Sequence, residues 1–565
     1  MLAYTAPRAP KSLSRPSITS DQLILIASVF WALALNRPFF GAALRAQAPG
    51  ALSNAAFAAG LALMLVALHA LLLGLVGTRQ TIKPLLALLT LVGALATHYM
   101  LAYGVVIDPS MVRNTLNTDV AETRELLSWS LALDLLLYAV LPIALLAFVR
   151  LEVRPWRRRW RARAVLLGGA AAVFALALMW QFQPLASMSR NHKGVRYLVT
   201  PLNTLWSLGS VLAADARGAA MPRQPVGLDA VPGPSWPMRS KPRLVVLVIG
   251  ETARADNWGL NGYARQTTPQ LARLTQVAPG VQSPVINFND VTACGTSTEV
   301  SLPCMFAPVG RRGYEEARIR GSESLLHVVA RAGVAVHWRD NQSGCKGVCE
   351  NLPHDTVSAT LAPGLCQSDR CLDEGLLRGL EERLGGLRGS RGTQLLVLHM
   401  LGNHGPSYYR RYPPAFERFT PVCRDDDLGR CTREEIVNAY DNALLYTDHV
   451  LATLIGTLSA HAEQVDSAMY FVSDHGESLG EKNLFLHGVP YIVAPREQTQ
   501  VPMVMWWSAG FGRSASLNAD CMRARARQPA AHDHLFHSLL GLLDVKTSLY
   551  APQFDVTRDC RNVPA

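Results

Sequence analysis

Long stretches without a charged side chain constrain this chain of 565 residues more than any other feature. Three of them cover residues 46–78, 84–107 and 164–189, and a fourth at 126–149 is interrupted only by Asp134. A membrane-spanning helix needs about 20 apolar residues, so each stretch is long enough to cross a bilayer. Together with the run from Leu23 to Leu44, they predict an α-helical membrane domain of five spans within residues 1–182.

The net charge of +11 lies mostly beside these spans. Residues 1–163 hold 16 Lys and Arg against 7 Asp and Glu, and residues 150–163 alone hold seven Arg and one Glu. Basic loops mark the cytoplasmic side of a membrane protein, so the excess charge indicates topology rather than a nucleic-acid partner. The other basic residues assigned to the cytoplasmic side are Arg8, Lys11, Arg15, Arg79 and Lys83. Five spans that start inside place everything after about residue 183 outside.

The cysteines support this orientation independently. All ten lie between Cys294 and Cys560, and none lies in the apolar half. An even number confined to one polar region is typical of disulfides formed in an oxidising compartment.

A signal-peptidase site is an alternative for the first apolar run, because Ala46-Gln47-Ala48 follows it. The length of the run, and Arg37 and Arg45 between it and the motif, favour an uncleaved anchor. Cleavage would leave the large polar domain on the same side.

Two polar features interrupt the membrane half. The outer loop 108–126 carries Asn114, Thr118 and Glu122 at four-residue spacing, which aligns them on one face if the segment is helical. Spacing alone favours a solvated juxtamembrane turn. Asp134 lies within a span, where a carboxylate is costly unless it is paired, so it indicates either a functional site or a buried hydrogen bond.

Residues 183–240 mix Pro, Gly and Ser with an amphipathic piece from Tyr197 to Leu212, which predicts a linker with a helix on the membrane surface. From residue 241 to residue 565, short β-branched runs alternate with helical stretches. This pattern predicts a soluble α/β sandwich on a mainly parallel sheet.

Three buried strands of this domain end in polar residues. The run LVVLVIGE ends in Glu251, QLLVLHMLGNH ends in His399 and His404, and SAMYFVSDHGES ends in Asp474, His475 and Glu477. Open α/β sheets place their sites at the carboxyl ends of their strands. Glu251, Asp474 and His475 offer oxygen and nitrogen ligands suited to a divalent metal such as zinc.

The segment VTACGTSTEVSLPCMF supplies hydroxyl groups at a predicted helix start, where free backbone N–H groups favour a phosphate. Such hydroxyls usually cap helices, and a nucleophilic role requires a metal that lowers the hydroxyl pKa. Lysine is scarce, with 7 Lys against 47 Arg, which draws attention to Lys346 in WRDNQSGCKGVCE. A small disulfide loop from Cys345 to Cys349 would hold this lysine rigid.

Five motifs together resemble the lipid A phosphoethanolamine transferases, a family that includes the mobile colistin-resistance enzymes. They are VIGETARADNWGLNGYARQTTP, TACGTSTEVSLPCMF, WRDNQSGCKGVC, LGNHGPSYYRRYP and FVSDHGESLGEKNLFLHGVPY. The resemblance runs from the first span to the carboxyl terminus. It implies five spans, a bridging helix and a periplasmic domain of the alkaline phosphatase and sulfatase type.

The resemblance also implies roles for residues. Thr298, four residues after Cys294, matches the nucleophile, and it binds the catalytic zinc with Glu251, Asp474 and His475. Residues matched to the phosphoryl group or a second zinc are Lys346, His404 and His487. Residues matched to the ethanolamine head are Asn114, Thr118 and Glu122. His399 and Glu477 fall in matching motifs without a firm role.

Disulfide pairing follows from the same resemblance, since ten cysteines alone allow many pairings. The family pattern implies the bridges Cys294–Cys304, Cys345–Cys349, Cys366–Cys371, Cys423–Cys431 and Cys521–Cys560. His532, His534 and His537 cluster on a predicted helix, where a packing or capping role is expected.

The expected activity is a ping-pong transfer in the inner membrane of a Gram-negative bacterium, with the catalytic domain in the periplasm. Thr298 takes phosphoethanolamine from phosphatidylethanolamine and passes it to lipopolysaccharide, with lipid A as the favoured acceptor. This modification contributes to resistance to cationic peptides and polymyxins. The acceptor could equally be Kdo or core heptose. Zinc is the expected cofactor, one ion or two.

Three other functions fit the pattern to different degrees. A phosphoglycerol transferase of the lipoteichoic-acid type shares the architecture, but the disulfides and the loop stripe argue against it. A sulfatase needs a Cys-x-Pro-x-Arg element, which the sequence lacks. A non-enzymatic membrane sensor with a hydrolase-like outer domain is the alternative from another class, and the intact ligand residues weigh against it.

Overall fold

The computed structural model describes residues 15–46, 51–219, 223–275, 285–367, 370–389 and 391–561. These residues pack into two compact units. The first comprises the chain up to Leu101 and Trp129–Trp206, and the second comprises Ala102–Ser128 and Ser207 onward. The domain limits expected after residues 182 and 240 stay predictions. Arg8, Lys11 and most of the Ala46-Gln47-Ala48 motif lie outside the described residues.

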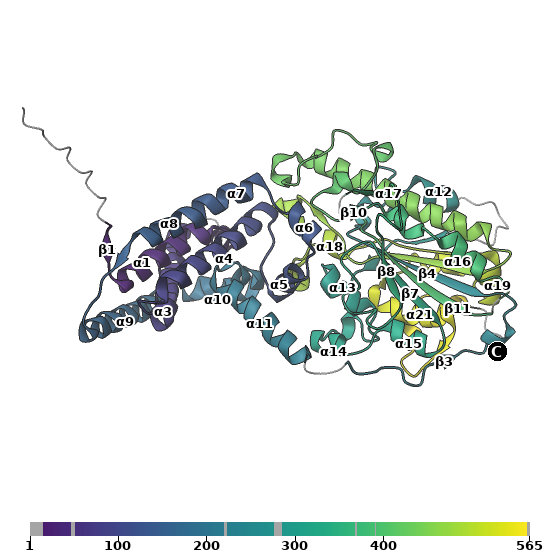
Figure 1. Ribbon diagram of the computed structural model, residues 1–565, viewed down its shortest axis with the longest axis horizontal. Helices are drawn as coiled ribbons and strands as arrows, with labels where there is room; N and C mark the ends of the chain where they lie inside the picture. Colours follow the sequence, from purple (N-terminus) through teal and green to yellow (C-terminus); the bar gives the residue numbers. More distant parts are fainter. Residues whose placement is uncertain are drawn as a thin grey trace, which may run out of the picture. The chain divides into compact units, whose positions relative to one another are not determined.

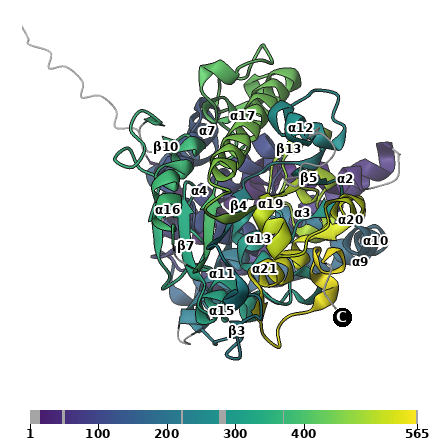
Figure 2. The ribbon, with the colours of Figure 1, turned by 90° about the vertical axis from the view of Figure 1, so that its right-hand side faces the viewer.

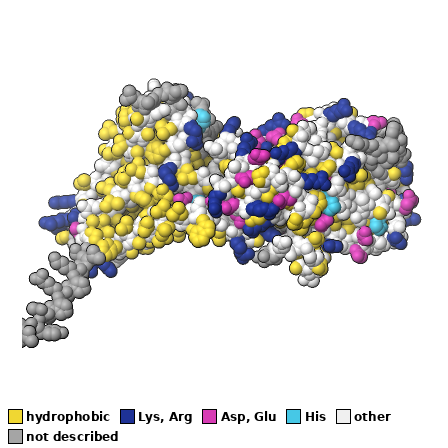
Figure 3. Space-filling model, turned by 90° about the horizontal axis from the view of Figure 1, so that it is seen from above, with side chains coloured by type: hydrophobic (Ala, Val, Ile, Leu, Met, Phe, Trp, Pro, Cys, Tyr) yellow, Lys and Arg dark blue, Asp and Glu magenta, His cyan; other side chains and the backbone are white. Residues whose placement is uncertain are grey.

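The first unit is built from apolar helices (Figure 1). Their bounds are α1 Ser20–Phe30, α2 Arg37–Arg45, α3 Ala51–Val76, α4 Ile82–Tyr103, α7 Trp129–Leu135, α8 Leu141–Phe148, α9 Trp156–Trp180 and α10 Phe182–Asn191. Four segments here are long and apolar enough to cross a membrane, namely Ser53–Val76, Ile82–Tyr103, Trp129–Phe148 and Trp156–Trp180, and the bent pair α1–α2 is a fifth candidate. Figure 3 shows hydrophobic side chains covering much of this unit's surface, which a membrane would bury. The predicted five-span helical domain is confirmed.

The candidate span formed by α1 and α2 is bent, whereas the sequence predicts one continuous run from Leu23 to Leu44. Ser20–Leu35 and Arg37–Arg45 meet at an angle of 56°. Pro38 lies at the start of α2 and cannot donate a backbone hydrogen bond, which breaks the helical ladder there. The Asn36 side chain stabilises the break, because its amide donates to the carbonyl oxygens of Trp31 and Thr200, both at 2.8 Å.

Asp134 in α7 has its partner in α4. Its Oδ2 lies 2.8 Å from Nδ1 of His98, and the His98 side chain is buried. This pair satisfies the carboxylate that the sequence places within a span.

The amphipathic helix expected from Tyr197 begins later. Tyr197 lies in a short 3-10 helix, Lys193–Leu198, and the α-helix α11 covers Leu202–Ala219. Pro201 directly precedes α11, and a proline disfavours helical backbone in the residue before it.

The second unit is centred on a seven-stranded sheet with the strand order β5-β15-β12-β4-β11-β7-β8. The strands are β4 Arg243–Gly250, β5 Val285–Phe288, β7 Ala335–Asp340, β8 His354–Thr356, β11 Thr393–His399, β12 Asp466–Ser473 and β15 Met503–Trp507. The five strands from β12 to β8 are parallel, whereas β15 pairs antiparallel with both β12 and β5. The apolar runs predicted as buried strands, β4 and β12, are buried at every position.

Helices cover both faces of this sheet (Figures 1 and 2). The α-helices described after β4 are α12 Pro269–Thr275, α13 Thr298–Met305, α14 Glu316–Arg320, α15 Leu325–Arg331, α16 Leu380–Gly386, α17 Arg433–Ala460, α18 Arg496–Thr499, α19 Ala509–Ser514, α20 Ala519–Arg525 and α21 Leu535–Leu543. One core lies between the sheet and α13, α15 and α21, with Val245 and Val397 packed near Leu326 and Leu539. The predicted α/β sandwich is confirmed.

Helix α17 is also apolar and long enough to cross a membrane. It belongs to the second unit, where it packs against α12 and β12 and buries Ile436, Leu444 and Leu451. Its hydropathy therefore reflects the core of the sandwich.

Candidate active site

The parallel register brings the predicted strand ends together. In the sheet, Ile249 of β4 pairs with His399 of β11 on one side and with Val472 of β12 on the other. Glu251 and Asp474 follow these strands directly, and the Asp474 amide donates to the Gly250 carbonyl at 2.9 Å. The polar residues after β4, β11 and β12 therefore meet at one edge, as open α/β sheets require.

Four of the predicted ligands form one buried group. The Thr298 hydroxyl donates to Glu251 Oε2 at 2.9 Å and lies 3.3 Å from His475 Nε2. The same nitrogen is 3.3 Å from Glu251 Oε1 and from Asp474 Oδ2. The His475 Nδ1 is hydrogen-bonded to the Gly476 carbonyl at 2.9 Å, which leaves Nε2 for a ligand.

Electrostatics fit a cation at this point. Burial and the neighbouring Glu251 raise the pKa of Asp474 to about 6. Burial opposes a charge on His475, but Asp474 and Glu251 outweigh it and raise the pKa of His475 to about 10. Glu251 Oε1 and Asp474 Oδ2 are both buried, and neither makes a hydrogen bond to the residues that the structure describes. Two carboxylates, an imidazole and a hydroxyl in this arrangement suit a divalent ion such as zinc.

Local backbone geometry holds the group tight. Thr298 begins α13, so its hydroxyl lies beside the free N–H groups of a helix start. Gly402, in the LGNH turn after β11, has a φ of +54°, and a Cβ there would lie 2.6 Å from the Glu251 carbonyl oxygen. Only glycine allows this approach. Thr252, directly after Glu251, adopts a φ of +52°, which is strained for a β-branched residue.

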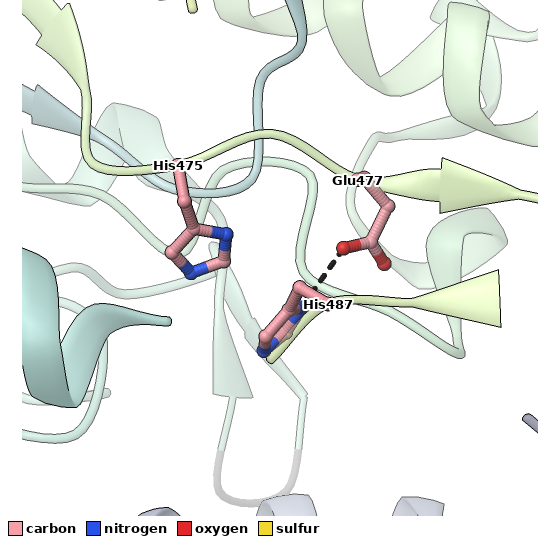
Figure 4. A group of neighbouring side chains, drawn as sticks. All are labelled: His475, Glu477 and His487. Atoms are coloured by element: carbon pink, nitrogen blue, oxygen red, sulfur yellow. Dashed lines mark hydrogen bonds and ion pairs between the residues drawn. The ribbon is translucent and has the colours of Figure 1, made fainter. Parts of the chain in front are cut away.

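A second group adjoins the first (Figure 4). Glu477 Oε2 bonds His487 Nδ1 at 2.8 Å, and the Tyr408 hydroxyl donates to Glu477 Oε1 at 2.6 Å. The rings of His475 and His487 lie 4.4 Å apart, and those of His404 and His487 lie 5.4 Å apart. Glu477 thus orients His487, and ligand atoms of His475, Glu477 and His487 are close enough to hold a second ion.

The outer loop reaches this second group from the other side. Glu122 Oε1 lies 3.4 Å from His404 Nε2. Burial opposes a charge on His404, but Glu122 raises the pKa of His404 to about 9. Burial likewise opposes a charge on Glu122, but His404 lowers the pKa of Glu122 to about 2. At neutral pH the two side chains form an ion pair.

The four-residue spacing is compatible with one helix, but the loop forms two. It consists of α5 Pro109–Leu116 and α6 Val120–Glu125, because Asp119 caps α6 by accepting from the Glu122 amide at 2.7 Å. Thr118 lies in the turn between them, and its hydroxyl donates to the Asn114 carbonyl at 2.8 Å. Asn114 and Thr118 therefore precede the helix that carries Glu122.

Arginine pairs that the sequence does not predict join this loop to the sandwich. Arg411 pairs with Glu125 in a fully buried contact, Arg370 pairs with Asp119 at 3.1 Å, and Arg113 pairs with Glu316 at 3.2 Å. No spacing signal connects these residues, since each pair spans more than 200 positions of the chain. The motif LGNHGPSYYRRYP, which contains Arg411, is the nearest hint.

Lys346 lies in the small loop closed by the Cys345–Cys349 bridge, as expected. Its backbone φ is +48°, and its ammonium donates to the Ser343 hydroxyl at 2.8 Å. It lies 4.0 Å from Oε2 of Glu299, the residue after Thr298. The structure contains the five bridges that the resemblance implies.

Two further histidines occupy supporting positions. His399 Nδ1 bonds Asp340 Oδ1 at 2.7 Å at the same sheet edge, and His399 is in neither ligand group. His532 accepts from the Cys294 amide through Nδ1 at 3.0 Å and bonds the Ser473 carbonyl through Nε2 at 2.9 Å. It therefore links the nucleophile segment to the strand that ends before Asp474, a capping role of the kind expected.

His534 and His537 belong to neither ligand group and bond to backbone amides. His534 Nδ1 caps its own turn by accepting from the Ala531 amide at 3.0 Å. His537 Nδ1 accepts from the Ala551 amide at 3.1 Å.

Comparison with known proteins agrees with the geometry. A family model described as phosphoethanolamine transferase EptA/EptB matches residues 65–216, and a sulfatase model matches residues 243–545. Phosphoethanolamine transferase EptA of Escherichia coli K12 is 35% identical over 98% of this chain and 99% of its own length. Phosphatidylethanolamine transferase Mcr-1 of Escherichia coli is 36% identical over 94% of this chain and 96% of its own length.

A solved structure covers nearly the whole fold. It is the integral membrane lipooligosaccharide phosphoethanolamine transferase A of Neisseria meningitidis, which matches with a TM-score of 0.90 and 35% identity over 97% of this chain and 99% of its own. The identity to these relatives over nearly the whole length of both chains shows that this chain belongs to the phosphoethanolamine transferase family.

Proposed function

We propose that this chain transfers phosphoethanolamine from phosphatidylethanolamine to lipopolysaccharide, with lipid A as the acceptor, through a phosphoethanolamine-Thr298 intermediate. The observation that carries the proposal is the buried Thr298 hydroxyl, which donates to Glu251 at 2.9 Å and lies 3.3 Å from His475. A hydroxyl in that setting can lose its proton toward a carboxylate and attack phosphorus.

Zinc is the cofactor that these residues fit. The residues that would hold it are Glu251, Thr298, Asp474 and His475. It would bind Glu251 Oε1 and Asp474 Oδ2, which make no hydrogen bond to the described residues. When bound, zinc lowers the pKa of the threonine hydroxyl and neutralises charge on the phosphoryl group. Metal binding would also displace the proton that the carboxylates otherwise hold on His475.

The donor fits the second group of side chains. The phosphoryl oxygens of the donor would face three side chains that can be positively charged, Lys346, His404 and His487. His404 is protonated at neutral pH because its pKa is raised to about 9. The Glu122 carboxylate, with Asn114 and Thr118 before it, suits the ammonium of the ethanolamine head. Thr298 Oγ1 bonds the phosphorus while the phosphorus–oxygen bond to diacylglycerol breaks.

In the second half of the reaction, an acceptor oxygen bonds the same phosphorus, the bond to Thr298 breaks, and the proton lost by the acceptor returns to Thr298 Oγ1. Lipid A is the proposed acceptor because a similar protein of Escherichia coli, at 28% identity, is a Kdo(2)-lipid A phosphoethanolamine 7''-transferase, whose acceptor contains lipid A. The proposed location is the inner membrane with the sandwich in the periplasm. The added ammonium lowers the negative charge that attracts polymyxins.

Expression in a Gram-negative strain that lacks its own phosphoethanolamine transferases tests the proposal. Mass spectrometry of extracted lipid A should show added phosphoethanolamine with the wild-type chain and none with Thr298→Ala. Added phosphoglycerol would identify the phosphoglycerol transferase alternative instead. Modification confined to Kdo or heptose would change the acceptor but keep the enzyme class, and unchanged lipopolysaccharide would favour the sensor.

A further inference from the structure

A polar pocket of about 320 Å³ opens beside the nucleophile helix in the second unit. Three cationic side chains line it, Arg223, Arg320 and Lys346, together with Asn117, Ser343 and Glu299. Among the described residues that line it, Glu299 is the one acid. The outer domain as a whole is nearly neutral, so three cations around one pocket are a local concentration of positive charge.

The pocket adjoins the reacting residue. Glu299 directly follows Thr298 in α13, and consecutive Cα atoms lie about 3.8 Å apart. Arg320 Nη2 donates to Glu299 Oε1 and to its carbonyl oxygen, both at 2.6 Å, and Lys346 lies 4.0 Å from Oε2. A ligand in the pocket would therefore touch the helix turn that presents Thr298.

The cations keep donor capacity for a ligand. Lys346 is 8% exposed, and its hydrogen bonds go to the hydroxyl and carbonyl of Ser343, which are neutral. Arg223 uses one terminal nitrogen for the Gly347 carbonyl and the other for Glu350 at 3.0 Å. Its Nε, like Nη1 of Arg320, makes no hydrogen bond to the part of the chain that the structure describes.

The pocket differs from the place proposed for the donor. The donor head fits between Glu122 and the pair His404 and His487, none of which lines this pocket. In a ping-pong reaction the second substrate must approach the phosphorus after diacylglycerol has left. When that substrate is itself a phosphate ester, two anions meet, and fixed cations are needed to offset their repulsion.

We infer that this pocket binds the phosphate monoester of the acceptor glycolipid, with Arg223 and Arg320 as the fork-shaped donors and Lys346 shared with the transferring group. Arginine suits this role because its planar donors match phosphate oxygens in pairs. The inference rests on the proposed function and names where its second substrate binds. The donor's phosphodiester offers the same chemistry, so the test must separate the two lipids.

The test uses the full-length protein in detergent with Arg223→Gln. One arm measures diacylglycerol release and labelling of Thr298 with phosphatidylethanolamine alone, and the other measures transfer to lipid A. A charge-assisted hydrogen bond to phosphate predicts a rise of about 10- to 100-fold in the KM for lipid A. The donor arm should stay within about twofold of wild type.

Two variants serve as controls. Arg331→Gln removes an arginine of similar exposure, 27% against 31% for Arg223, which pairs with Glu323 at 2.6 Å outside the pocket. It should leave both arms unchanged. Arg223→Lys keeps the charge but loses the fork, so its KM for lipid A should lie between those of wild type and Arg223→Gln, which keeps the test valid if the glutamine variant folds poorly.

The outcomes separate the two claims. An unchanged KM for lipid A in Arg223→Gln, or an equal loss in the donor arm, would overturn the assignment of the pocket to the acceptor. Equal transfer by the wild-type protein to lipid A with and without enzymatically removed phosphates would also overturn it. A wild-type protein that neither releases diacylglycerol nor labels Thr298 would instead refute the proposed function.

Discussion

The contact between Glu125 and Arg411 makes a strong prediction about the outer loop. Both side chains are buried, with Arg411 at 0% exposure, and Arg411 Nε also donates to the His404 carbonyl at 2.6 Å. Glu125 lies on α6 almost one turn after Glu122, the residue that pairs with the His404 ring. The pair therefore fixes the loop beside the same residue that Glu122 contacts.

Glu125→Gln leaves the Arg411 guanidinium buried without its counter-charge. Removing one partner of a buried ion pair costs about 3–5 kcal/mol. Because about 1.4 kcal/mol corresponds to a tenfold change in an equilibrium constant, the docked state of the loop should lose roughly 100- to 4,000-fold in population relative to the open state. The enzyme should then bind the donor more weakly, because Glu122 moves with α6.

Asp119→Asn is the matched control. Asp119 also pairs with an arginine, Arg370, but 35% of its side chain is exposed, and exposed pairs contribute about 0–1 kcal/mol. Asparagine is also as good a helix cap as aspartate, so α6 keeps its first hydrogen bonds. Any large effect of Glu125→Gln that Asp119→Asn lacks is then due to burial of the charge.

Hydrogen exchange of the full-length protein measures loop opening directly. The amides of Glu122 and Thr123 bond Asp119 at 2.7 and 2.9 Å, and they exchange only when α6 opens. Glu125→Gln should speed their exchange by roughly 100- to 4,000-fold, and Asp119→Asn by less than about tenfold. Equal protection in the two variants would refute the view that the buried pair holds the loop.

Three further predictions concern metal, acid and the small disulfide loop. Removal of metal by a chelator should abolish transfer, and added zinc should restore it; full activity in the chelated protein would exclude the metal role. Burial lowers the pKa of His532 to about 4, so between pH 4 and pH 6.5 the folded state binds fewer protons than the unfolded state. The free energy of unfolding should therefore decline as pH falls from about 6.5 to about 4. His532→Gln should therefore unfold at a lower temperature at pH 7 and show a flatter dependence on acid, and an unaltered slope would contradict this. The double variant with Cys345→Ser and Cys349→Ser should raise the KM for the donor several-fold, because Lys346 is then held less rigidly. Its melting temperature should change little, because the bridge closes a loop of only four residues. An unchanged KM would show that the bridge does not position the lysine.

Residues at the ends of strands could be predicted from the sequence because parallel register is a simple rule. Glu251 and Asp474 follow apolar runs, and once β4 and β12 are neighbours, their register brings the two carboxylates together. The five spans were predictable for a similar reason, since long runs almost free of charged side chains mark them.

Features that depend on contacts between distant segments could not be predicted. Nothing near Asp134 in the sequence points to His98 in another helix, and no spacing links Arg411 to Glu125. The break in the outer loop at Asp119 could not be predicted either. The four-residue spacing of Asn114, Thr118 and Glu122 continues across Asp119, although Asp119 caps a new helix, α6. A local pattern cannot show which of two compatible backbones the rest of the fold selects.

The central claim is that Thr298 carries the phosphoethanolamine group. The most direct test is mass analysis of the full-length protein incubated with phosphatidylethanolamine in the absence of acceptor, followed by mapping of the modified peptide. The account predicts one added phosphoethanolamine on Thr298 that disappears when lipid A is supplied and never forms in Thr298→Ala. Addition at another residue, or transfer to lipid A by Thr298→Ala, would contradict it.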